Sequence, residues 1–181
     1  MFINPMTAIK EGWMKGVLED HVEPNAVDIR LEKIWKVDET TEFSLYQEGK
    51  EHRRRTEVES TTIVHEGMKV AQDMWTLERG IYDFMSPAYV EMPEGTVGWL
   101  VTRSTLNRNG VFVLSGLYDS GYEGHINGML YVRGGTMMME KMSRVAQFIV
   151  GSSDSFGTYS GGYNTIEGSI PEYFNESQSN E

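Results

Sequence analysis

Residues 97–132, VGWLVTRSTLNRNGVFVLSGLYDSGYEGHINGMLYV, contain apolar runs that are separated by glycine, asparagine and charged residues. The runs are VGWLVT, GVFVLSGLY and HINGMLYV. Short apolar runs between turn residues are typical of strands in a β-barrel or sandwich. The stretch therefore predicts a series of short strands joined by tight connections.

The same pattern continues on both sides of this stretch. TTIV, DMWTL and IYDFM precede it between residues 61 and 85, and RVAQFIV follows at 144–150. Long helices do not alternate with these runs, which argues against a parallel α/β sheet. The sequence predicts a mainly β fold, either a barrel or a sandwich.

A short helix is predicted before the strands. Apolar residues recur at helical spacing across residues 5–19, and Pro5 suits an early helical position. After the turn at Pro24-Asn25 the pattern changes, because apolar and polar residues alternate over 26–32. That alternation predicts a strand with one buried face.

Two segments differ from the β pattern. Residues 38–60 are polar and dense in charge, so we expect a long excursion or a solvated hairpin, with Arg53–Arg55 in solvent rather than on a nucleic acid. A Gly/Ser-rich tail begins at residue 151 and cannot build a core of its own. The prediction is one β domain over 1–150 and a flexible C-terminal segment over 151–181, either a linker or an arm that orders over a ligand.

Composition excludes several function classes. The chain has 181 residues and a formal net charge of −11, which opposes binding to DNA, RNA or an anionic membrane. It has no cysteine, so disulfides, zinc–thiolate sites and cysteine nucleophiles are excluded. The N-terminus lacks the pattern of a signal peptide, and no stretch has the ~18 apolar residues of a membrane span. We expect a cytoplasmic protein, in the host cytoplasm if the source is viral.

Polar side chains in these segments are candidates for chemistry. Arg103, Ser104 and Arg108 suit an anion, since guanidinium and hydroxyl groups donate hydrogen bonds to phosphate. Asp119 lies between glycines and tyrosines in a tight bend, where a carboxylate can hold and polarise a water. Each segment taken alone also fits a solvated turn or hairpin, so both interpretations stay open at this level.

Taken together and in this order, the segments resemble the family of dCTP deaminases and dUTP diphosphatases. The family's five motifs are matched by NAVDIRL (25–31), VGWLVTRSTLNRNG (97–110), GLYDSGYEG (116–124), SRVAQFIV (143–150) and TYSGGYN (158–164). The second of these is closest to the deaminase form, and the opening helix is similar to that branch. The third motif continues into a strand that is similar to that of the dUTP diphosphatases.

The resemblance implies a distorted β-barrel or jelly roll that forms homotrimers, with active sites shared between subunits and closed by the C-terminal arm. It implies hydrolysis of dUTP to dUMP and pyrophosphate, with Mg2+ on the triphosphate, because the negative charges must be neutralised before a water approaches. One alternative is a dCTP deaminase or a bifunctional dCTP deaminase/dUTPase. A second is a non-catalytic, nucleotide-binding regulatory trimer.

By the same resemblance, each matched residue has an expected role. Asp119 orients the attacking water, and Tyr122 packs against the deoxyribose. Asp28 is associated with the metal through water. The other expected substrate contacts are Arg103, Ser104, Arg108, Arg144 and Gln147 on the phosphate side and Tyr159 and Tyr163 on the arm.

Departures from the family pattern bear on the reaction. Deaminases of the family use a glutamate on the strand after the third motif, and that position holds Met129 here. A thioether cannot transfer protons, so we expect dUTP hydrolysis with little or no deamination. Thr158 and Tyr159 stand where dUTP diphosphatases have an arm arginine, which makes Arg108 a candidate for part of its contact to the γ-phosphate. Tyr118 replaces an aliphatic residue beside the pyrimidine pocket.

The remaining histidines and tryptophans have structural interpretations. The histidines show no metal-ligand spacing, and His125, which follows the third motif, is expected at the surface. The tryptophans are expected in the core or at a trimer interface. The histidines are His21, His52, His65 and His125, and the tryptophans are Trp13, Trp35, Trp75 and Trp99.

Overall fold

The computed structural model describes residues 1–64, 71–171 and 174. Strands predominate, and the helices are short: α1 (Pro5–Lys10), the 3-10 helix η1 (Glu19–His21) and α2 (Ser104–Arg108). The predicted mainly β class is therefore confirmed. Within the described residues, no helix has the length and apolar character needed to cross a bilayer.

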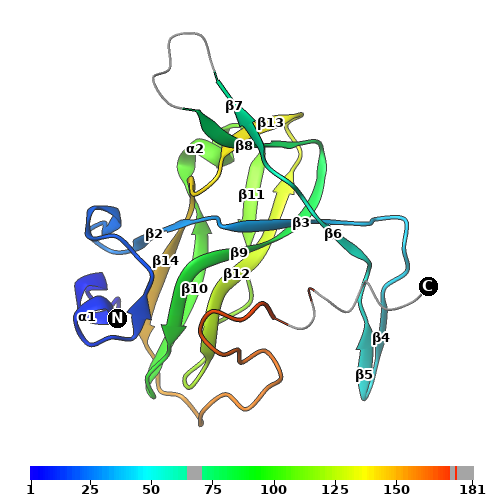
Figure 1. The fold of residues 1–181 in the computed structure, drawn as a ribbon. Helices are drawn as coiled ribbons and strands as arrows, with labels where there is room; N and C mark the ends of the chain where they lie inside the picture. The colour runs from blue at the N-terminus through cyan, green and yellow to red at the C-terminus, as the bar shows by residue number, and fades with distance from the viewer. Residues whose placement is uncertain (65–70, 172–173, 175–181) are drawn as a thin grey trace.

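The largest sheet has the antiparallel strand order β11-β12-β9-β3-β6, and β1 pairs with the end of β9. Figure 1 shows β9 and β12 side by side at the centre of the molecule. The third motif connects β11 to β12, so this sheet carries one part of the candidate site. The strands are β1 (Met14–Lys15), β3 (Lys33–Val37), β6 (Arg55–Glu57), β9 (Gly80–Glu91), β11 (Val111–Leu114) and β12 (Glu123–Val132).

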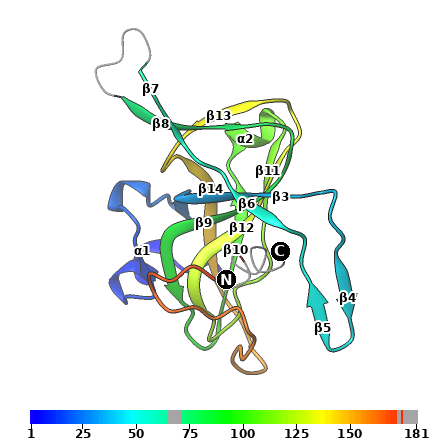
Figure 2. The ribbon, with the colours of Figure 1, turned by 45° about the vertical axis from the view of Figure 1, so that its right-hand side comes forward.

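The other described strands form smaller sheets, in the orders β10-β14-β2, β13-β8-β7 and β4-β5. The sheets stay separate in the described chain instead of closing into one barrel, so the jelly roll is the predicted form that fits. Figure 2 shows the β4–β5 hairpin extending away from the sheets. The bounds are β2 (Val27–Arg30), β4 (Ser44–Tyr46), β5 (Gly49–Glu51), β7 (Thr61–Ile63), β8 (Gln72–Leu77), β10 (Thr96–Thr102), β13 (Met137–Glu140) and β14 (Arg144–Ser152).

The core lies between these sheets and is built from alternate residues of their strands. Ile29 on β2, Ile34 on β3, Phe84 on β9 and Leu130 on β12 are fully buried in one cluster. Their neighbours Trp35, Asp83 and Met129 therefore lie on the opposite face of the large sheet, as the two-residue period of a strand requires. Trp35 and Trp75 are buried and Trp13 and Trp99 half-buried.

The predicted helix over residues 5–19 is wrong in its extent, because α1 ends at Lys10. Its start is defined by Asn4, whose side chain accepts a 3.0 Å hydrogen bond from the N–H of Met6. Gly12 and Gly16 have φ angles of +78° and +70°, in the left-handed region that terminates a helix. The chain then enters β1 instead of making further helical turns.

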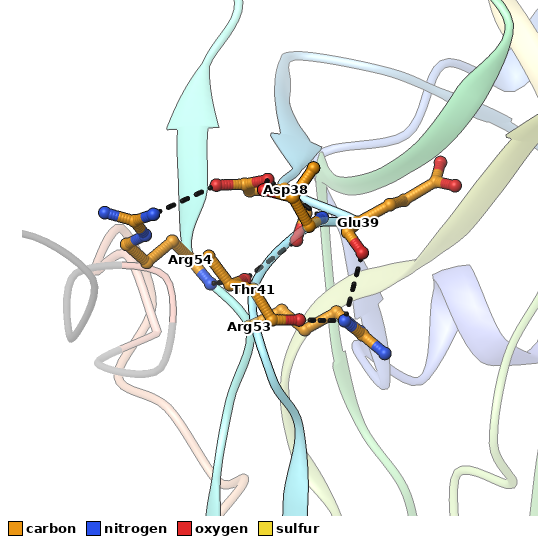
Figure 3. A network of polar contacts seen from close by, with 6 residues as sticks. Asp38, Glu39, Thr41, Arg53 and Arg54 are labelled. Carbon is orange, nitrogen blue, oxygen red and sulfur yellow. Dashed lines mark hydrogen bonds and ion pairs between the residues drawn. The ribbon is translucent and has the colours of Figure 1, made fainter.

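The excursion over 38–60 contains the predicted solvated hairpin, β4–β5, and polar contacts close its base. Arg54 Nη2 lies 3.4 Å from Asp38 Oδ2. Arg53 Nη1 donates to the carbonyl of Glu39 at 3.3 Å and to that of Thr41 (Figure 3). The arginines thus hold the two strands that lead into the hairpin at a fixed separation.

The expectation that the whole arginine run lies in solvent is wrong for Arg55. Its side chain is 11% exposed and forms an ion pair with Asp83 on β9, whose side chain is 19% exposed. The reason is that β6 pairs with β3 at the edge of the large sheet, which carries Arg55 over the sheet's outer face. The excursion therefore returns to the body of the protein and contributes to its surface there.

Candidate functional site

A pocket of about 280 Å³ lies against the third-motif hairpin, and we call it the hairpin pocket. Its residues come from the hairpin and β12, from the C-terminal arm, and from β6, β9 and the chain before β6. They are Gly116, Leu117, Tyr118, Tyr122, Asn127 and Gly128; Tyr159 and Tyr163; and His52, Arg55 and Asp83. Its walls are mainly aromatic, with a few polar groups, as in many small-molecule sites.

Tyr118 holds the two sides of the hairpin together. Its hydroxyl donates to the carbonyl of Asn127 and accepts a 3.1 Å hydrogen bond from the Asn127 N–H. Asn127 is paired with Met85 of β9, directly after an irregularity in that register, and on its other side the β11–β12 ladder ends at Met129. Burial raises the pKa of the Tyr118 phenol, which stays protonated as its hydrogen bond to the Asn127 carbonyl requires. The aromatic substitution noted in the sequence is therefore a structural part of the pocket.

Tyr122 and Tyr159 form an aromatic wall of the pocket. Tyr122 is buried, and its ring meets Tyr159 of the arm edge to face at 5.8 Å and Tyr118 at 5.2 Å. Burial raises the pKa of Tyr122 to about 12. Aromatic surface of this kind suits a sugar or a base. The arm and the hairpin meet at this contact.

Asp119 lies at the mouth of the hairpin and is exposed. Its carbonyl accepts a 3.0 Å hydrogen bond from the Tyr122 N–H, which closes the turn between the two residues. The preceding Tyr118 forms a backbone bridge with Gly98 near the start of β10. The Asp119 carboxylate is therefore exposed on a turn whose backbone is held on both sides.

Asp28 is the centre of a second group, on β2, β14 and the start of α2. Its side chain has no exposed surface. The carboxylate lies 3.4 Å from Arg103 Nη2 and 3.2 Å from Arg144 Nη1, and it accepts a 3.1 Å hydrogen bond from Gln147 Nε2. Ser104 and Arg108 lie on α2, directly after Arg103, and are exposed. We call this group the arginine cluster.

The burial of Asp28 disagrees with its expected role beside a metal. A carboxylate without exposed surface cannot meet the water shell of an ion, and both of its oxygens already have donors. The charge of Asp28 is instead used to hold Arg103 and Arg144 side by side. We correct the assignment of Asp28 from metal contact to positioning residue.

The hairpin pocket and the arginine cluster lie at opposite ends of β10. Tyr118 meets the strand at Gly98, whereas Arg103 follows its last residue, Thr102. At about 3.3 Å per residue, the five steps along the chain from Gly98 to Arg103 span roughly 16 Å. The sequence-predicted residues therefore form two groups in one chain. Asp119 belongs to neither the lining of the hairpin pocket nor the arginine cluster.

The described part of the C-terminal arm follows β12, and Figure 1 shows it in orange beside that strand. Backbone hydrogen bonds join Tyr159 to Ser120 at 2.6 Å and Thr165 to Glu123 at 2.9 Å. The Tyr89 hydroxyl donates to the Thr165 carbonyl at 2.8 Å. These contacts hold Tyr159 at the hairpin pocket.

His125 also binds the arm, and the expectation of a surface position for it is wrong. It is buried, with Nδ1 at 3.1 Å from the Ser86 carbonyl. A carbonyl only accepts, so Nδ1 carries the hydrogen and Nε2 is free to accept. Nε2 accepts a 3.0 Å hydrogen bond from the Gly168 N–H. The sequence showed a histidine directly after the third motif, but it did not show that this position on β12 is buried.

Tyr163, the second arm aromatic, contacts the excursion. Its ring lies under Lys50 of β5, with Nζ 4.0 Å from the ring centroid. Tyr163 also lines the hairpin pocket, together with His52 and Arg55. Sequence reasoning missed these excursion residues, since the only signal was an arginine run in a polar segment.

Metal-binding clusters of three or more His, Cys, Asp or Glu residues are absent from the described part of the chain. His65 falls outside it, and so do residues 172, 173 and 175–181 of the predicted arm. An ion that is carried by a triphosphate needs no such cluster, because Mg2+ takes phosphate oxygens and waters as ligands.

Comparison with known proteins gives one family. The profile of the family described as dCTP deaminase-like matches residues 6–152. A probable deoxyuridine 5'-triphosphate nucleotidohydrolase of Halobacterium salinarum is 27% identical over 147 residues, 81% of this chain and 85% of that protein. A deoxyuridine 5'-triphosphate nucleotidohydrolase of Methanocaldococcus jannaschii is also 27% identical, over 80% of this chain and 88% of its own length.

Deaminases are among the similar proteins as well. A dCTP deaminase of Pyrobaculum aerophilum is 24% identical over 84% of this chain and 82% of its own length. The crystal structure of the 2'-deoxycytidine 5'-triphosphate deaminase from Agrobacterium tumefaciens superposes with a TM-score of 0.60 at 13% identity, over 82% of this chain. The chain spans about half of that protein, 47%. At such low identity the superposition shows a shared fold.

Proposed function

The chain belongs to the dCTP deaminase-like family, and on that premise we propose that it hydrolyses dUTP to dUMP and pyrophosphate. Relatives of similar length are named as nucleotidohydrolases of deoxyuridine triphosphate, which supports this reaction. The hairpin pocket supplies a site for a pyrimidine nucleoside, and the arginine cluster supplies cationic groups for phosphates.

The observation that carries the proposal is the residue at position 129. Met129 lies on β12, directly opposite Leu114 of β11 and Asp83 of β9. This is the position to which the family resemblance assigns the proton-transferring glutamate of deaminases. A thioether neither donates nor accepts a proton near neutral pH, so position 129 lacks a proton-transferring group. Chemistry at the phosphates remains, and it requires no group at position 129.

Asp119 is the proposed general base. It accepts a proton from a water that attacks the α-phosphorus, so that a bond forms between the water oxygen and phosphorus. The bond from the α-phosphorus to the bridging oxygen breaks, and pyrophosphate leaves with that oxygen. Asp119 is exposed and directly follows the pocket residue Tyr118, so a water has access to its carboxylate.

Arg103 and Arg144 are the proposed phosphate contacts, together with Ser104, Arg108 and Gln147. Asp28 holds both guanidinium groups but leaves Arg103 29% and Arg144 37% exposed, so each keeps donors directed to solvent. Paired guanidinium groups neutralise a triphosphate more effectively than separate ones. Tyr122, Tyr159 and Tyr163 enclose the sugar and base.

Mg2+ is the proposed metal, bound mainly through the triphosphate. The described residues offer no cage of carboxylates, and a substrate-borne ion fits this donor set. When bound, the ion would lower the negative charge that a water meets at the phosphates. The chain's own contribution is the arginine cluster on the same phosphates.

A homotrimer with shared sites is the proposed assembly. The hairpin pocket and the arginine cluster lie at opposite ends of β10 in one chain, and a second copy is a natural source of the missing half of each site. For location we keep the cytoplasm as a proposal, since the chain has no cysteine that an oxidising compartment would pair.

A second candidate function is deamination of dCTP, alone or with hydrolysis. It is favoured by the named deaminases among the similar proteins and by one carboxylate, Asp83, directly opposite Met129. The non-catalytic regulatory trimer is favoured by Thr158 and Tyr159 in place of the arm arginine, but Asp119 and the intact second motif argue against it.

Product analysis separates these functions. The wild-type protein is incubated with dUTP, dCTP and dTTP in the presence of Mg2+, and the products are resolved by ion-exchange chromatography. We expect dUMP and pyrophosphate from dUTP, an arrest of the reaction by a chelator, and no uracil nucleotide from dCTP. Release of dUTP or dUMP from dCTP at a rate similar to that of dUTP hydrolysis would overturn the assignment.

A further inference from the structure

We propose that Asp83 is a specificity-determining residue, which accepts a hydrogen bond from an N–H group on the polar edge of the pyrimidine, and that Arg55 positions it. The inference rests on the proposed function, because it identifies how the same pocket reads its base. It concerns residues outside every motif on which the resemblance was based.

Asp83 belongs to the hairpin pocket by position and by register. It lines the pocket with Tyr118, Tyr122 and Asn127. In the antiparallel ladder it lies directly opposite Met129 on one side and Trp35 on the other. Side chains of directly opposite residues lie on the same face with Cβ atoms about 5 Å apart. The carboxylate therefore lies next to the place where a deaminase would present its glutamate to the ring.

Arg55 fixes one oxygen of this carboxylate and leaves the other for a ligand. Arg55 Nε donates to Asp83 Oδ2, and Arg55 Nη1 donates to the Arg53 carbonyl at 2.9 Å. No further described residue donates to the Asp83 side chain. Since Arg55 is anchored at the base of the excursion, the carboxylate is held in one orientation, with Oδ1 available as an acceptor.

The surroundings make this acceptor effective. Trp35 and Met129 flank Asp83 with apolar surface, and the pair is largely removed from solvent. A buried ion pair adds little net stability, so its presence in the wall of a pocket calls for another role. A hydrogen bond to a charged acceptor in such surroundings is stronger than one to a neutral acceptor.

The backbone groups of Asn127 are already engaged within the pocket, which favours recognition of the base by a side chain. The Tyr118 hydroxyl already occupies both the N–H and the carbonyl of Asn127. An N–H donor on the pyrimidine edge then has Asp83 as its charged acceptor. For uracil this donor is N3–H, and for cytosine it is the exocyclic amine. We assign N3–H, in line with the proposed reaction.

The test compares dUTP with N3-methyl-dUTP, which lacks the donor. For the wild type we expect a KM for the methylated substrate roughly tenfold or more above that for dUTP. In Asp83→Asn the charge is lost and only a neutral amide oxygen can accept, so the KM for dUTP should rise and the ratio of the two KM values should fall. The matched control is Asp73→Asn on β8, which lies outside the pocket and should keep the wild-type ratio.

Folding is controlled separately. Asp83→Asn removes one charge of the Arg55–Asp83 ion pair, so the double variant Arg55→Gln/Asp83→Asn removes both. Thermal melting identifies the folded variants. A folded variant without the carboxylate that retains the wild-type ratio of KM values overturns the proposal, and so does a wild type that does not distinguish the two substrates. If Asp83→Asn raises the KM for dCTP but not for dUTP, the donor is the cytosine amine and the uracil assignment is wrong.

Failure of the proposed function is recognised independently. Calorimetric binding of dUMP and N3-methyl-dUMP to the same variants requires no turnover. The wild type could bind dUMP more tightly than the methylated nucleotide, through Asp83, and yet hydrolyse no triphosphate. That result would support recognition of the base by Asp83 and refute the proposed dUTP hydrolysis.

Discussion

Gln147 lies directly opposite Asp28 in the β14–β2 pair and donates a 3.1 Å hydrogen bond to its buried carboxylate. The same carboxylate holds Arg144 through the other oxygen. Residues from the first and fourth motifs are thus joined by one charge, and Arg103 of the second motif joins them at 3.4 Å. The arrangement makes the phosphate side of the proposed site depend on a residue that no phosphate touches.

Replacement of Asp28 by Asn should therefore affect stability and substrate binding together. The variant retains the shape but leaves two guanidinium groups without their counter-ion, and we expect a loss of about 2–3 kcal/mol in the free energy of unfolding. The KM for dUTP should rise by roughly tenfold or more, because Arg103 and Arg144 are no longer held side by side. Urea unfolding and steady-state kinetics measure both effects. Asp154→Asn, at an exposed position, is the control and should change neither.

Removal of the Tyr118 hydroxyl should destabilise the third-motif hairpin. Tyr118→Phe removes the partner of the N–H and carbonyl of Asn127 at a half-buried position, at a cost of about 2–4 kcal/mol. Tyr46→Phe on the exposed β4 removes a hydroxyl in solvent and should be neutral. Equal unfolding free energies for Tyr118→Phe and the wild type would refute the role assigned to this hydroxyl.

The buried tyrosines predict a loss of stability at high pH. Burial raises the pKa of Tyr122 from 10.0 to about 12, so the folded state binds its proton more tightly than the unfolded state does. The stabilisation is fully present below pH 10 and is lost as the pH rises toward 12. The melting temperature should fall across this interval, and less steeply in Tyr122→Phe. A fall that begins below pH 9 with the same slope in both proteins would contradict the assignment.

His125 should control how firmly the arm is held. His125→Phe removes the acceptor for the Gly168 N–H, so amide hydrogen exchange in the arm around residue 168 should accelerate by about tenfold. Lys15→Met, which removes the exposed ion pair with Glu167, should accelerate it far less. An unchanged exchange rate in His125→Phe would show that the arm is held by its other contacts.

Much of the fold could be predicted from the sequence, because strands have a local signal in alternating or short apolar runs. The alternation around Ile29 and the apolar runs of β10, β12 and β14 identify the β class without tertiary information. The prediction of a helix over residues 5–19 was wrong for a local reason as well. Gly12 and Gly16 have positive φ angles, which end the helix although the apolar spacing continues. Such angles depend on the contact with β9, which spacing does not reveal.

The candidate site was harder to predict, because it depends on pairings between distant residues. Arg55 and Asp83 are 28 positions apart, and neither lies in a motif. Their meeting requires that β6 and β9 flank β3, and a charged segment gives no sign of that order. The reversal for Asp28, from metal contact to positioning residue, has the same origin, since burial on β2 follows from the pairing with β14.

The central claim is that Asp119 activates water for the hydrolysis of dUTP, and the kcat of Asp119→Asn tests it most directly. The amide retains the size of the side chain but accepts no proton, so its kcat should fall at least about a hundredfold, with dUTP still bound. Melting and dUMP binding establish that the variant is folded. A folded Asp119→Asn that releases dUMP and pyrophosphate at the wild-type rate would contradict the account.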